Sequence, residues 1–220
     1  DISQSDLVDA QLLIVRTRTK CNKNLLEGTS VQMVSTATIG TDHMDISWLE
    51  QAGITWSNAP GCNSGSVRQY IGSVLAHLII SGINPAETTI GIVGVGMVGS
   101  KVEQLARTLG FKVMLNDPPR ARREGDAQFT DYRTLVSNAD IITYHTPLNM
   151  SGPDASYHLL SEDLLNLLKP GVVIINSSRG EVTDTKAMLS GLTAGMIGKL
   201  VLDVWENEPD ISSELHEKVW

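Results

Sequence analysis

Arg179 is a permanent cation that closely follows an apolar stretch, Val172–Asn176. Such a residue either caps a surface feature or binds an anion, and its guanidinium matches the two oxygens of a carboxylate. Two acids follow along the chain: Asp203 after the next apolar run, and Glu208 in a turn fixed by Pro209. A carboxylate such as Glu208 can hold a neighbouring acid–base group in its charged form. Together these residues suit chemistry on a small acid, whereas each alone is compatible with a surface salt bridge.

A glycine-rich segment, GIVGVGMVG, places Gly94, Gly96 and Gly99 in a G-x-G-x-x-G frame. The frame follows an expected strand and opens an expected helix, which is the context that indicates dinucleotide binding. Gly94 permits a tight turn and Gly96 lets the backbone approach a pyrophosphate. The N–H groups near Met97 and Val98 would point at that group. The alternative is a glycine turn that only packs a helix on a strand.

Asp117 ends the next expected strand after the glycine frame. An acid that follows the frame in this place is the one that binds the ribose of a dinucleotide. A carboxylate there accepts hydrogen bonds from both ribose hydroxyls and repels a 2′-phosphate, so it favours NAD over NADP. Arg120, Arg122 and Arg123 follow and weaken that preference, because they could neutralise a phosphate.

The segment YHTPL, Tyr144 to Leu148, ends another expected strand. In a dinucleotide-binding fold this exit passes beneath the cofactor. We expect Thr146 to contact ribose and Pro147 to pack on the adenosine side. His145 is a candidate base, but its position suits a cofactor contact better.

Two segments nearer the N-terminus are candidate anion sites. Arg16–Lys20, VRTRTK with its preceding valine, follows a strand with basic and hydroxyl side chains, which suit a phosphate or carboxylate. The alternative is a solvated charged turn. Thr38 and Gly40 could bring backbone amides to an anion, although a helix-capping loop with a structural His43 is the simpler interpretation.

Strands and amphipathic helices alternate from Thr88 onward. The expected strands are Thr89–Val93, Lys112–Asn116, Ile141–Tyr144, Val172–Asn176 and Leu200–Val204. Apolar residues from Val98 to Leu109 recur at helical spacing, with Gly110 as a stop signal, and Ser161 is expected to cap a helix over EDLLNLL. Alternation of this kind predicts an α/β fold with a doubly wound parallel sheet, the Rossmann arrangement. Ligands of such sheets gather at the carboxyl ends of the strands.

The first part of the chain predicts a smaller α/β unit. Its expected strands and helical pieces are Leu12–Arg16, Gln32–Thr36, Ile54–Ser57, Leu25–Glu27 and Ile46–Gln51. The turn formers of Ser57–Ser66 mark a boundary, followed by a helix over Val67–Ile80. We therefore expect a flavodoxin-like substrate domain at 1–66, truncated before its first strand. An NAD-binding domain at 67–220, cut short at its C-terminal end, would follow.

The composition excludes several classes. A net charge of −8 argues against nucleic acid or an anionic membrane as a partner. No apolar run approaches the roughly 20 residues that a membrane helix needs. The two cysteines, Cys21 and Cys62, have no metal-site spacing and no disulfide framework, which indicates reduced thiols, a cytoplasmic protein and no metal.

The motifs GIVGVGMVG, HTPL, LLKPGVVIINSSRGEV and LDVWENEP, in this order and spacing, resemble the D-2-hydroxyacid dehydrogenases. The resemblance covers nearly the whole chain. It implies that Arg179 and Glu208 are catalytic, and that Thr17 and Thr38 contact substrate. Besides the glycine loop and Arg179, the NAD contacts that it implies are Asp117, Thr146, Ser177, Ser178 and Asp203. The family's catalytic His would lie beyond the end of this chain, and His216 is too close to Glu208 to match it.

Within the family, GTDHMD, NAPGCN, NDPPRA and the Gly-Pro insertion after HTPL are most similar to members that oxidise 4-phosphoerythronate during pyridoxal phosphate synthesis. The resemblance thus implies a homodimeric, NAD-dependent enzyme that oxidises the 2-hydroxyl of this substrate. The basic and hydroxyl side chains of Arg16 and its neighbours are then our candidates for contact with its phosphate. The alternatives are another phosphorylated hydroxy acid, such as 3-phosphoglycerate, or a non-catalytic NAD-sensing module.

Overall fold

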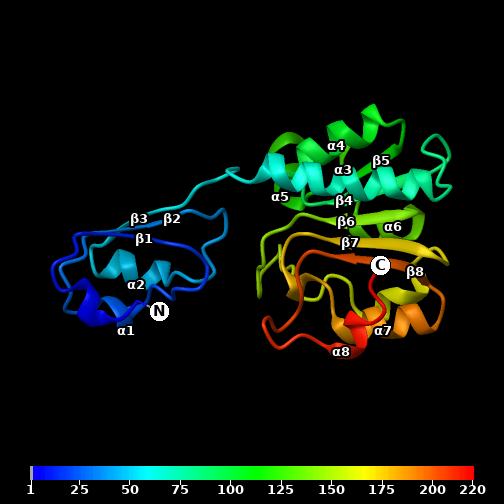
Figure 1. Cartoon of the computed structure of the whole chain (residues 1–220). Coiled ribbons are helices and arrows are strands. Elements are labelled where there is room, and N and C mark those ends of the chain that lie inside the picture. The colour runs from blue at the N-terminus through cyan, green and yellow to red at the C-terminus, as the bar shows by residue number, and fades with distance from the viewer. Residues whose placement is uncertain (1) are drawn as a thin grey trace. The chain divides into compact units, whose positions relative to one another are not determined.

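The computed structural model describes residues 2–220 and divides the chain into two compact units, Asp1–Gly65 and Ser66–Trp220 (Figure 1). The expected division fell one residue later. Each unit has its own sheet and its own core.

The first unit contains a three-stranded parallel sheet in the order β1-β2-β3. The strands are β1 (Leu12–Val15), β2 (Met33–Thr36) and β3 (Thr55–Ser57), and the helices are the 3₁₀ helix η1 (Gln4–Leu7), α1 (Lys23–Leu26) and α2 (Ile46–Gln51). Val34 and Leu49 are fully buried in its core. Leu12 and Ile14 of β1 face outward and are 52% and 65% exposed. One face of this edge strand is therefore apolar and open.

The second unit contains a five-stranded parallel sheet in the order β5-β4-β6-β7-β8. The strands are β4 (Thr89–Val93), β5 (Lys112–Asn116), β6 (Ile141–Tyr144), β7 (Val172–Asn176) and β8 (Ile197–Leu202). The chain leaves β4 toward β5 on one side and returns to β6 on the other. This reversal beside β4 is where sheets of this kind bind ligands.

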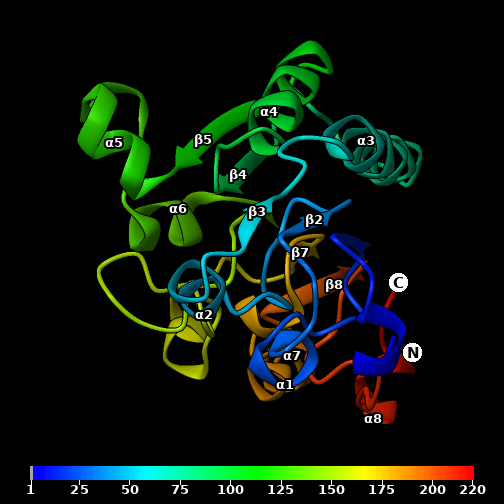
Figure 2. The same ribbon diagram turned by 90° about the vertical axis from the view of Figure 1, so that its left-hand side faces the viewer.

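Helices cover both faces of this sheet (Figures 1 and 2). They are α3 (Ser64–Ile80), α4 (Gly99–Thr108), α5 (Pro118–Glu124), α6 (Tyr132–Asn138), α7 (Thr185–Thr193), α8 (Ser213–His216) and the 3₁₀ helices η2 (Asp126–Gln128), η3 (Glu162–Leu167) and η4 (Gly180–Val182). Helices α3 and α4 pack in one core with alternate strand residues such as Ile175, while α6 and α7 pack in the other with residues such as Ile174. The near-continuous apolar strands are thus explained by burial on both faces, and the doubly wound fold is confirmed. None of the described helices is long and apolar enough to cross a membrane.

Strand β8 was predicted wrongly, at Leu200–Val204 instead of Ile197–Leu202. Its second residue is Gly198, and a Cβ there would lie 2.6 Å from the carbonyl oxygen of Gly171. The close backbone approach requires glycine, and glycine hides the start of the strand from an apolar pattern.

The helix predicted after Ser161 is also different. It is the 3₁₀ helix η3, and the Ser161 hydroxyl donates to the Asp163 carboxylate at 2.5 Å rather than capping the helix. Helix α1 begins at Lys23, earlier than expected, because the Asn22 side chain accepts from the Leu25 amide at 3.3 Å. The predicted stop at Gly110 is confirmed, since its φ is +90° and helix α4 ends just before it.

Candidate functional site

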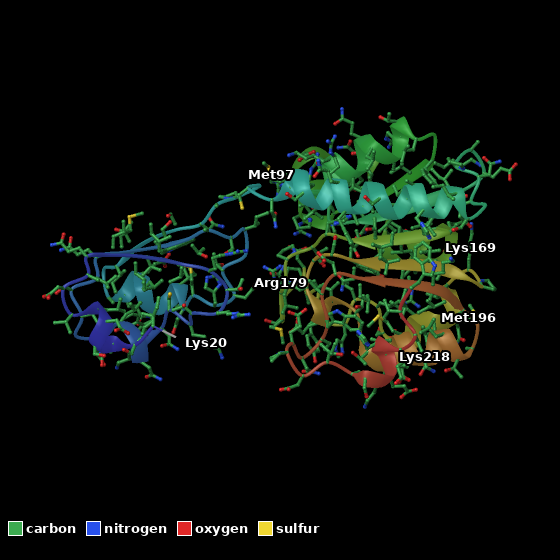
Figure 3. The ribbon with its side chains drawn as sticks, in the orientation of Figure 1. Lys20, Met97, Lys169, Arg179, Met196 and Lys218 are labelled. Carbon is green, nitrogen blue, oxygen red and sulfur yellow. The ribbon has the colours of Figure 1, made fainter. Side chains whose placement is uncertain are left out.

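The candidate residues of the second unit gather where its strands end. Met97 follows β4 and Arg179 follows β7, and both lie at one end of the sheet in Figure 3, with Lys169 and Met196 at the other. The shared direction of parallel strands produces this grouping.

The three glycines of the frame are required for three different reasons. Gly94 has a φ of +85°, and a Cβ there would lie 2.8 Å from the backbone of His145. Gly99 lies at the start of α4, where a Cβ would come within 2.0 Å of the Gly94 carbonyl oxygen, so helix and loop can pack only without it. At Gly96 nothing lies within 4 Å of an added Cβ. Only Gly96 therefore faces open space, which fits a loop that receives a pyrophosphate.

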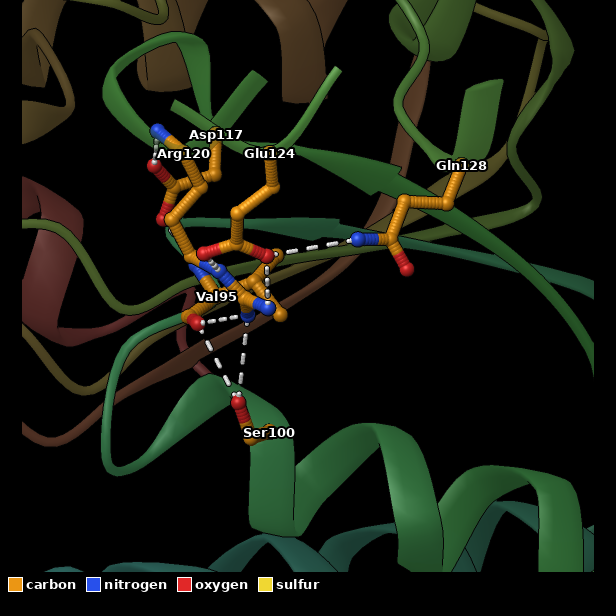
Figure 4. A network of polar contacts seen from close by, with 6 residues as sticks. All are labelled: Val95, Ser100, Asp117, Arg120, Glu124 and Gln128. Carbon is orange, nitrogen blue, oxygen red and sulfur yellow. Dashed lines mark hydrogen bonds and ion pairs between the residues drawn. The ribbon is translucent and has the colours of Figure 1, made fainter. Parts of the chain in front are cut away.

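A polar network fixes the glycine loop from the side of β5 (Figure 4). The Asp117 carboxylate accepts from the Val95 amide at 2.8 Å and from the Arg120 amide at 2.9 Å. The Arg120 guanidinium donates to the Val95 carbonyl at 2.6 Å and pairs with Glu124 at 2.7 Å. The backbone of Val95 is thus held at both its N–H and its C=O.

This network also bears on the three arginines after Asp117. Arg120 is engaged with Glu124, and Arg122 pairs with Asp154 at 2.5 Å. Because two of these cations already have carboxylate partners, they are poorly placed to neutralise a 2′-phosphate. The arrangement favours NAD over NADP.

A cavity of about 220 Å³ opens at the carboxyl ends of β4, β5 and β6. Apolar side chains line much of it: Val93, Pro118, Pro119, Pro147, Pro153 and Leu159. Two residues that line it, Thr146 and Asp154, each have one buried side-chain oxygen without a hydrogen-bond partner among the described residues, Thr146 Oγ1 and Asp154 Oδ1. Buried polar atoms nearly always have partners. The cavity therefore fits a largely apolar, flat group that offers hydrogen bonds at its edge, as the adenosine half of NAD does.

A pair of tyrosines supports this cavity. The hydroxyls of Tyr132 and Tyr144 lie 2.9 Å apart, and the Tyr132 hydroxyl also donates to the Leu159 carbonyl at 2.9 Å. Burial raises the pKa of both phenols, so both stay neutral. They form a rigid wall rather than a catalytic group.

His145 is held between two hydroxyls. Its Nε2 lies 3.0 Å from Thr143 Oγ1, and its Nδ1 lies 3.2 Å from Ser177 Oγ. Burial lowers the pKa of His145 to about 3. A neutral imidazole with both nitrogens engaged is suited to orienting Ser177 rather than to accepting a proton.

Asn176 organises the turn that carries Arg179, a role that the sequence pattern did not indicate. It is fully buried, its amide donates to the Arg179 carbonyl at 2.8 Å and to Thr183 at 3.1 Å, and its oxygen accepts from the Ser178 amide at 3.0 Å. The half-buried Arg179 side chain donates to the Ser178 carbonyl at 2.7 Å. The arginine is therefore presented from a rigid turn.

The segment that contains Glu208 packs directly on this turn. A Cβ on Gly180 would lie 2.0 Å from the Trp205 carbonyl, so the two backbones touch. The Asp203 amide donates to the Asn176 carbonyl at 3.0 Å, and the Glu208 carboxylate accepts from the Trp205 amide at 2.8 Å. The structure thus brings together the segments of Arg179, Asp203 and Glu208.

Among the described residues, His158, Asp184 and Glu206 form one group whose donor atoms lie within 4.8 Å of one another. His158 Nε2 lies only 2.6 Å from Glu206 Oε1, which is the length of a charge-assisted hydrogen bond. Burial opposes ionisation of Glu206, but hydrogen bonds from Thr185 and His158 outweigh it and lower its pKa. The hydrogen bonds of this group tie together three segments of the chain.

The first unit holds Arg16, Thr17 and Thr38 after two neighbouring strands, β1 and β2. Arg16 and Thr17 are exposed. The Thr38 hydroxyl donates to the Gly40 carbonyl and lies within 2.8 Å of the hydroxyl of Thr36. Since β1 and β2 are parallel, the three residues lie together at the carboxyl ends of these two strands.

Known proteins are similar to this chain in sequence and in fold. Residues 68–219 match the family model described as D-isomer specific 2-hydroxyacid dehydrogenase, NAD binding domain. The erythronate-4-phosphate dehydrogenase of Bacteroides fragilis is 50% identical over 220 residues, 100% of this chain and 63% of the relative. That of Proteus mirabilis is 50% identical over 215 residues, 97% of this chain and 57% of the relative. The chain thus spans less than two thirds of these curated relatives.

Among solved structures, the D-lactate dehydrogenase of Aquifex aeolicus, complexed with NAD and lactic acid, superimposes with a TM-score of 0.77. It is 24% identical, and the match covers 94% of this chain and 68% of that one. At this identity the likeness concerns the fold.

Proposed function

The chain belongs to the D-isomer specific 2-hydroxyacid dehydrogenase family, and from this premise we propose that the protein oxidises the 2-hydroxyl of 4-phosphoerythronate to a 2-keto acid with NAD. The relatives that support the substrate are about 50% identical but longer than this chain. When bound, the nicotinamide supplies the hydride acceptor.

One observation carries the proposal. The turn of Arg179 packs on the segment of Glu208, and both lie at the carboxyl ends of the strands, where the glycine loop also lies. A dinucleotide on that loop runs along this edge. A cation and a carboxylate are then available beside its far end, which is what a 2-hydroxy acid and its acid–base partner require.

Each residue has a distinct role in this proposal. Arg179 holds the substrate carboxylate through two hydrogen bonds. Glu208 stabilises the charged form of the acid–base His that the family resemblance puts after residue 220. Asp203 contacts the carboxamide of the nicotinamide.

The remaining cofactor contacts are on the adenosine side and along the pyrophosphate. Asp117 accepts from the ribose hydroxyls in addition to its backbone donors. Thr146, Ser177 and Ser178 are the other proposed contacts, along with the amides of Gly96–Gly99.

The phosphate of the substrate is proposed to meet Arg16, Thr17 and Thr38. Exposed Arg16 supplies charge, and the two threonines supply hydroxyls from adjacent strand ends. We also propose, from the resemblance, that the whole protein is a cytoplasmic homodimer of pyridoxal phosphate synthesis; its free thiols, Cys21 and Cys62, fit a reducing compartment.

The test uses the full-length protein that contains this chain. NADH formation is followed with 4-phosphoerythronate and, side by side, with 3-phosphoglycerate. Turnover with the second acid alone would replace the substrate, and NAD binding without turnover on either would favour a sensing module.

A variant assigns the role of the arginine. Arg179→Ala is expected to lower kcat/KM by at least about 100-fold, since a charge-assisted bidentate contact is lost, while the Kd for NADH changes much less, because Arg179 is only one of many proposed cofactor contacts. The matched control is Arg107→Ala on the exposed side of α4, where the pair with Glu103 is a surface one. Equal activity of both variants would remove Arg179 from the mechanism.

A further inference from the structure

We propose that Asp154 accepts a hydrogen bond from the exocyclic amine of the cofactor's adenine and thereby selects adenine dinucleotides over those with an oxygen at that position. This inference rests on the proposed function, because it concerns the same cofactor cavity. Asp154 lies in the Gly-Pro insertion after HTPL.

The cavity is lined by Asp117 at the end of β5 and by residues that follow β6, with β4 between these strands. In this fold the acid at the end of the second strand binds the adenosine ribose. A cavity that begins at Asp117 and continues past Pro118 and Pro119 is therefore in the place of the purine.

The walls of the cavity are mostly apolar. Their proline rings and aliphatic side chains suit the faces of a flat aromatic ring, and they leave only its edge for hydrogen bonding. A purine ring fits this description better than a ribose or a pyrophosphate does.

Asp154 has one carboxylate oxygen without a hydrogen-bond partner. Its Oδ1 is buried and has no partner among residues 2–220, whereas Oδ2 accepts from Arg122 at 2.5 Å. A buried acceptor without a partner destabilises the folded protein, most of all when it is charged. An ionised carboxylate can only accept, so a ligand group that pairs with Oδ1 has to be a donor.

Arg122 sets the direction of this acceptor. It lies on α5, which follows β5, and reaches the Asp154 loop that follows β6. The ion pair thus joins two walls of the cavity. Because Arg122 engages Oδ2, Oδ1 is the oxygen of Asp154 that is left for a further hydrogen bond.

Adenine presents an N–H₂ group at its edge, while hypoxanthine and guanine present a carbonyl oxygen at the same position. A carboxylate would bind the first and repel the second. Asp117 has a separate function at the ribose, which leaves the base edge to Asp154.

The experiment measures Kd for the reduced forms of NAD and nicotinamide hypoxanthine dinucleotide by fluorescence titration of the full-length protein. Wild type is expected to bind the adenine form at least about 10-fold more tightly, as a hydrogen bond to a charged group contributes about 1.5–3 kcal/mol. Asp154→Ala should weaken binding of the adenine form by about 10-fold and bring the ratio close to one. Asp154→Asn, which can turn an N–H₂ toward a carbonyl oxygen, should shift the preference toward hypoxanthine.

Asp126→Asn, an exposed carboxylate in η2, is the matched control and should leave the ratio unchanged. Unfolding temperatures verify that each variant is folded. A wild-type ratio near one, or an unaltered ratio in both Asp154 variants, would overturn the role of Asp154 alone. Failure of the wild type to bind either dinucleotide would instead overturn the proposed function.

Discussion

Replacing Gly180 by alanine tests whether the arginine turn and the Glu208 segment depend on each other. The new methyl carbon would lie 2.0 Å from the carbonyl carbon and oxygen of Trp205 and 2.3 Å from the amide nitrogen of Glu206. These are backbone atoms, so no side-chain rotation relieves the overlap.

The structure gives the size of the effect. Ordinary contact begins at 3.4 Å, so the two backbones must separate by about 3.4 − 2.0 = 1.4 Å. Overpacking of this kind costs about 1–3 kcal/mol. For a unit of this size, 2 kcal/mol lowers Tm by about 4–8 °C. A misplacement of about 1 Å beside a catalytic group costs roughly 100-fold in rate, and Arg179 is the adjacent residue.

The assay combines kcat for NADH formation by the full-length protein with Tm from circular dichroism. We expect Gly180→Ala to lower both, with a smaller effect on the Kd for NADH, because the glycine loop and Asp117 are elsewhere and only the contacts near this turn are disturbed. The control is Gly65→Ala in helix α3, where nothing lies within 4 Å of the new methyl group. Alanine stabilises a helix by about 0.5–1 kcal/mol relative to glycine, so this variant should keep its activity.

Two results would contradict the reasoning. A Gly180→Ala protein with wild-type Tm would mean that the backbones are not in contact. A reduced Tm with wild-type kcat would mean that the contact exists but does not position Arg179.

Three further predictions concern stability. Ile174→Ala should lower the free energy of unfolding by about 2–5 kcal/mol in urea titrations, because Ile174 is fully buried, whereas Ile80→Ala, at an 82% exposed position, should change it by less than about 0.5 kcal/mol. Tyr132→Phe should cost about 1–3 kcal/mol by leaving Tyr144 and a carbonyl unpaired, and adding Tyr144→Phe should cost less than its separate effect if the hydroxyls interact. The pKa of Glu206 is lower in the folded protein than its ordinary value of 4.5. Its ionised carboxylate therefore stabilises the fold at pH values above 4.5, and this contribution is lost as pH falls through the folded-state pKa. The difference in unfolding free energy between wild type and Glu206→Gln should therefore shrink from pH 7 to pH 3, and a difference that stays constant would contradict this assignment.

Strands β4 to β7 could be predicted to the residue because apolar runs buried on both faces end abruptly at turn formers. Strand β8 could not, because Gly198 serves a backbone approach to Gly171, which lies before strand β7 in the chain. Local patterns report burial well, but they carry no information about which distant backbone a glycine must admit.

The candidate site, like the strands, could be predicted from the sequence only in part. The glycine frame, Asp117 and Arg179 carry recognisable residue types at strand ends, so their grouping follows from the parallel sheet. The ion pair of Arg122 and Asp154 joins residues 32 positions apart, and neither has a local signal. Asn176 was read only as the end of a strand, since nothing in its neighbours indicates that its amide would be fully enclosed.

The strand order of the larger unit has a consequence for how the protein folds. Pairing of β4 with β5 closes the loop from Thr89 to Lys112, whereas pairing of β4 with β6 closes the longer loop from Ile90 to Ile141. The second loop is roughly twice as long as the first, and each doubling of loop length makes closure less favourable by about 0.6 kcal/mol. We therefore expect β4 to pair with β5 before it pairs with β6, so that the β4–β6 seam closes late. The nucleotide cavity lies at that seam, so it is completed late. Dinucleotide should therefore slow unfolding without accelerating the early phases of refolding.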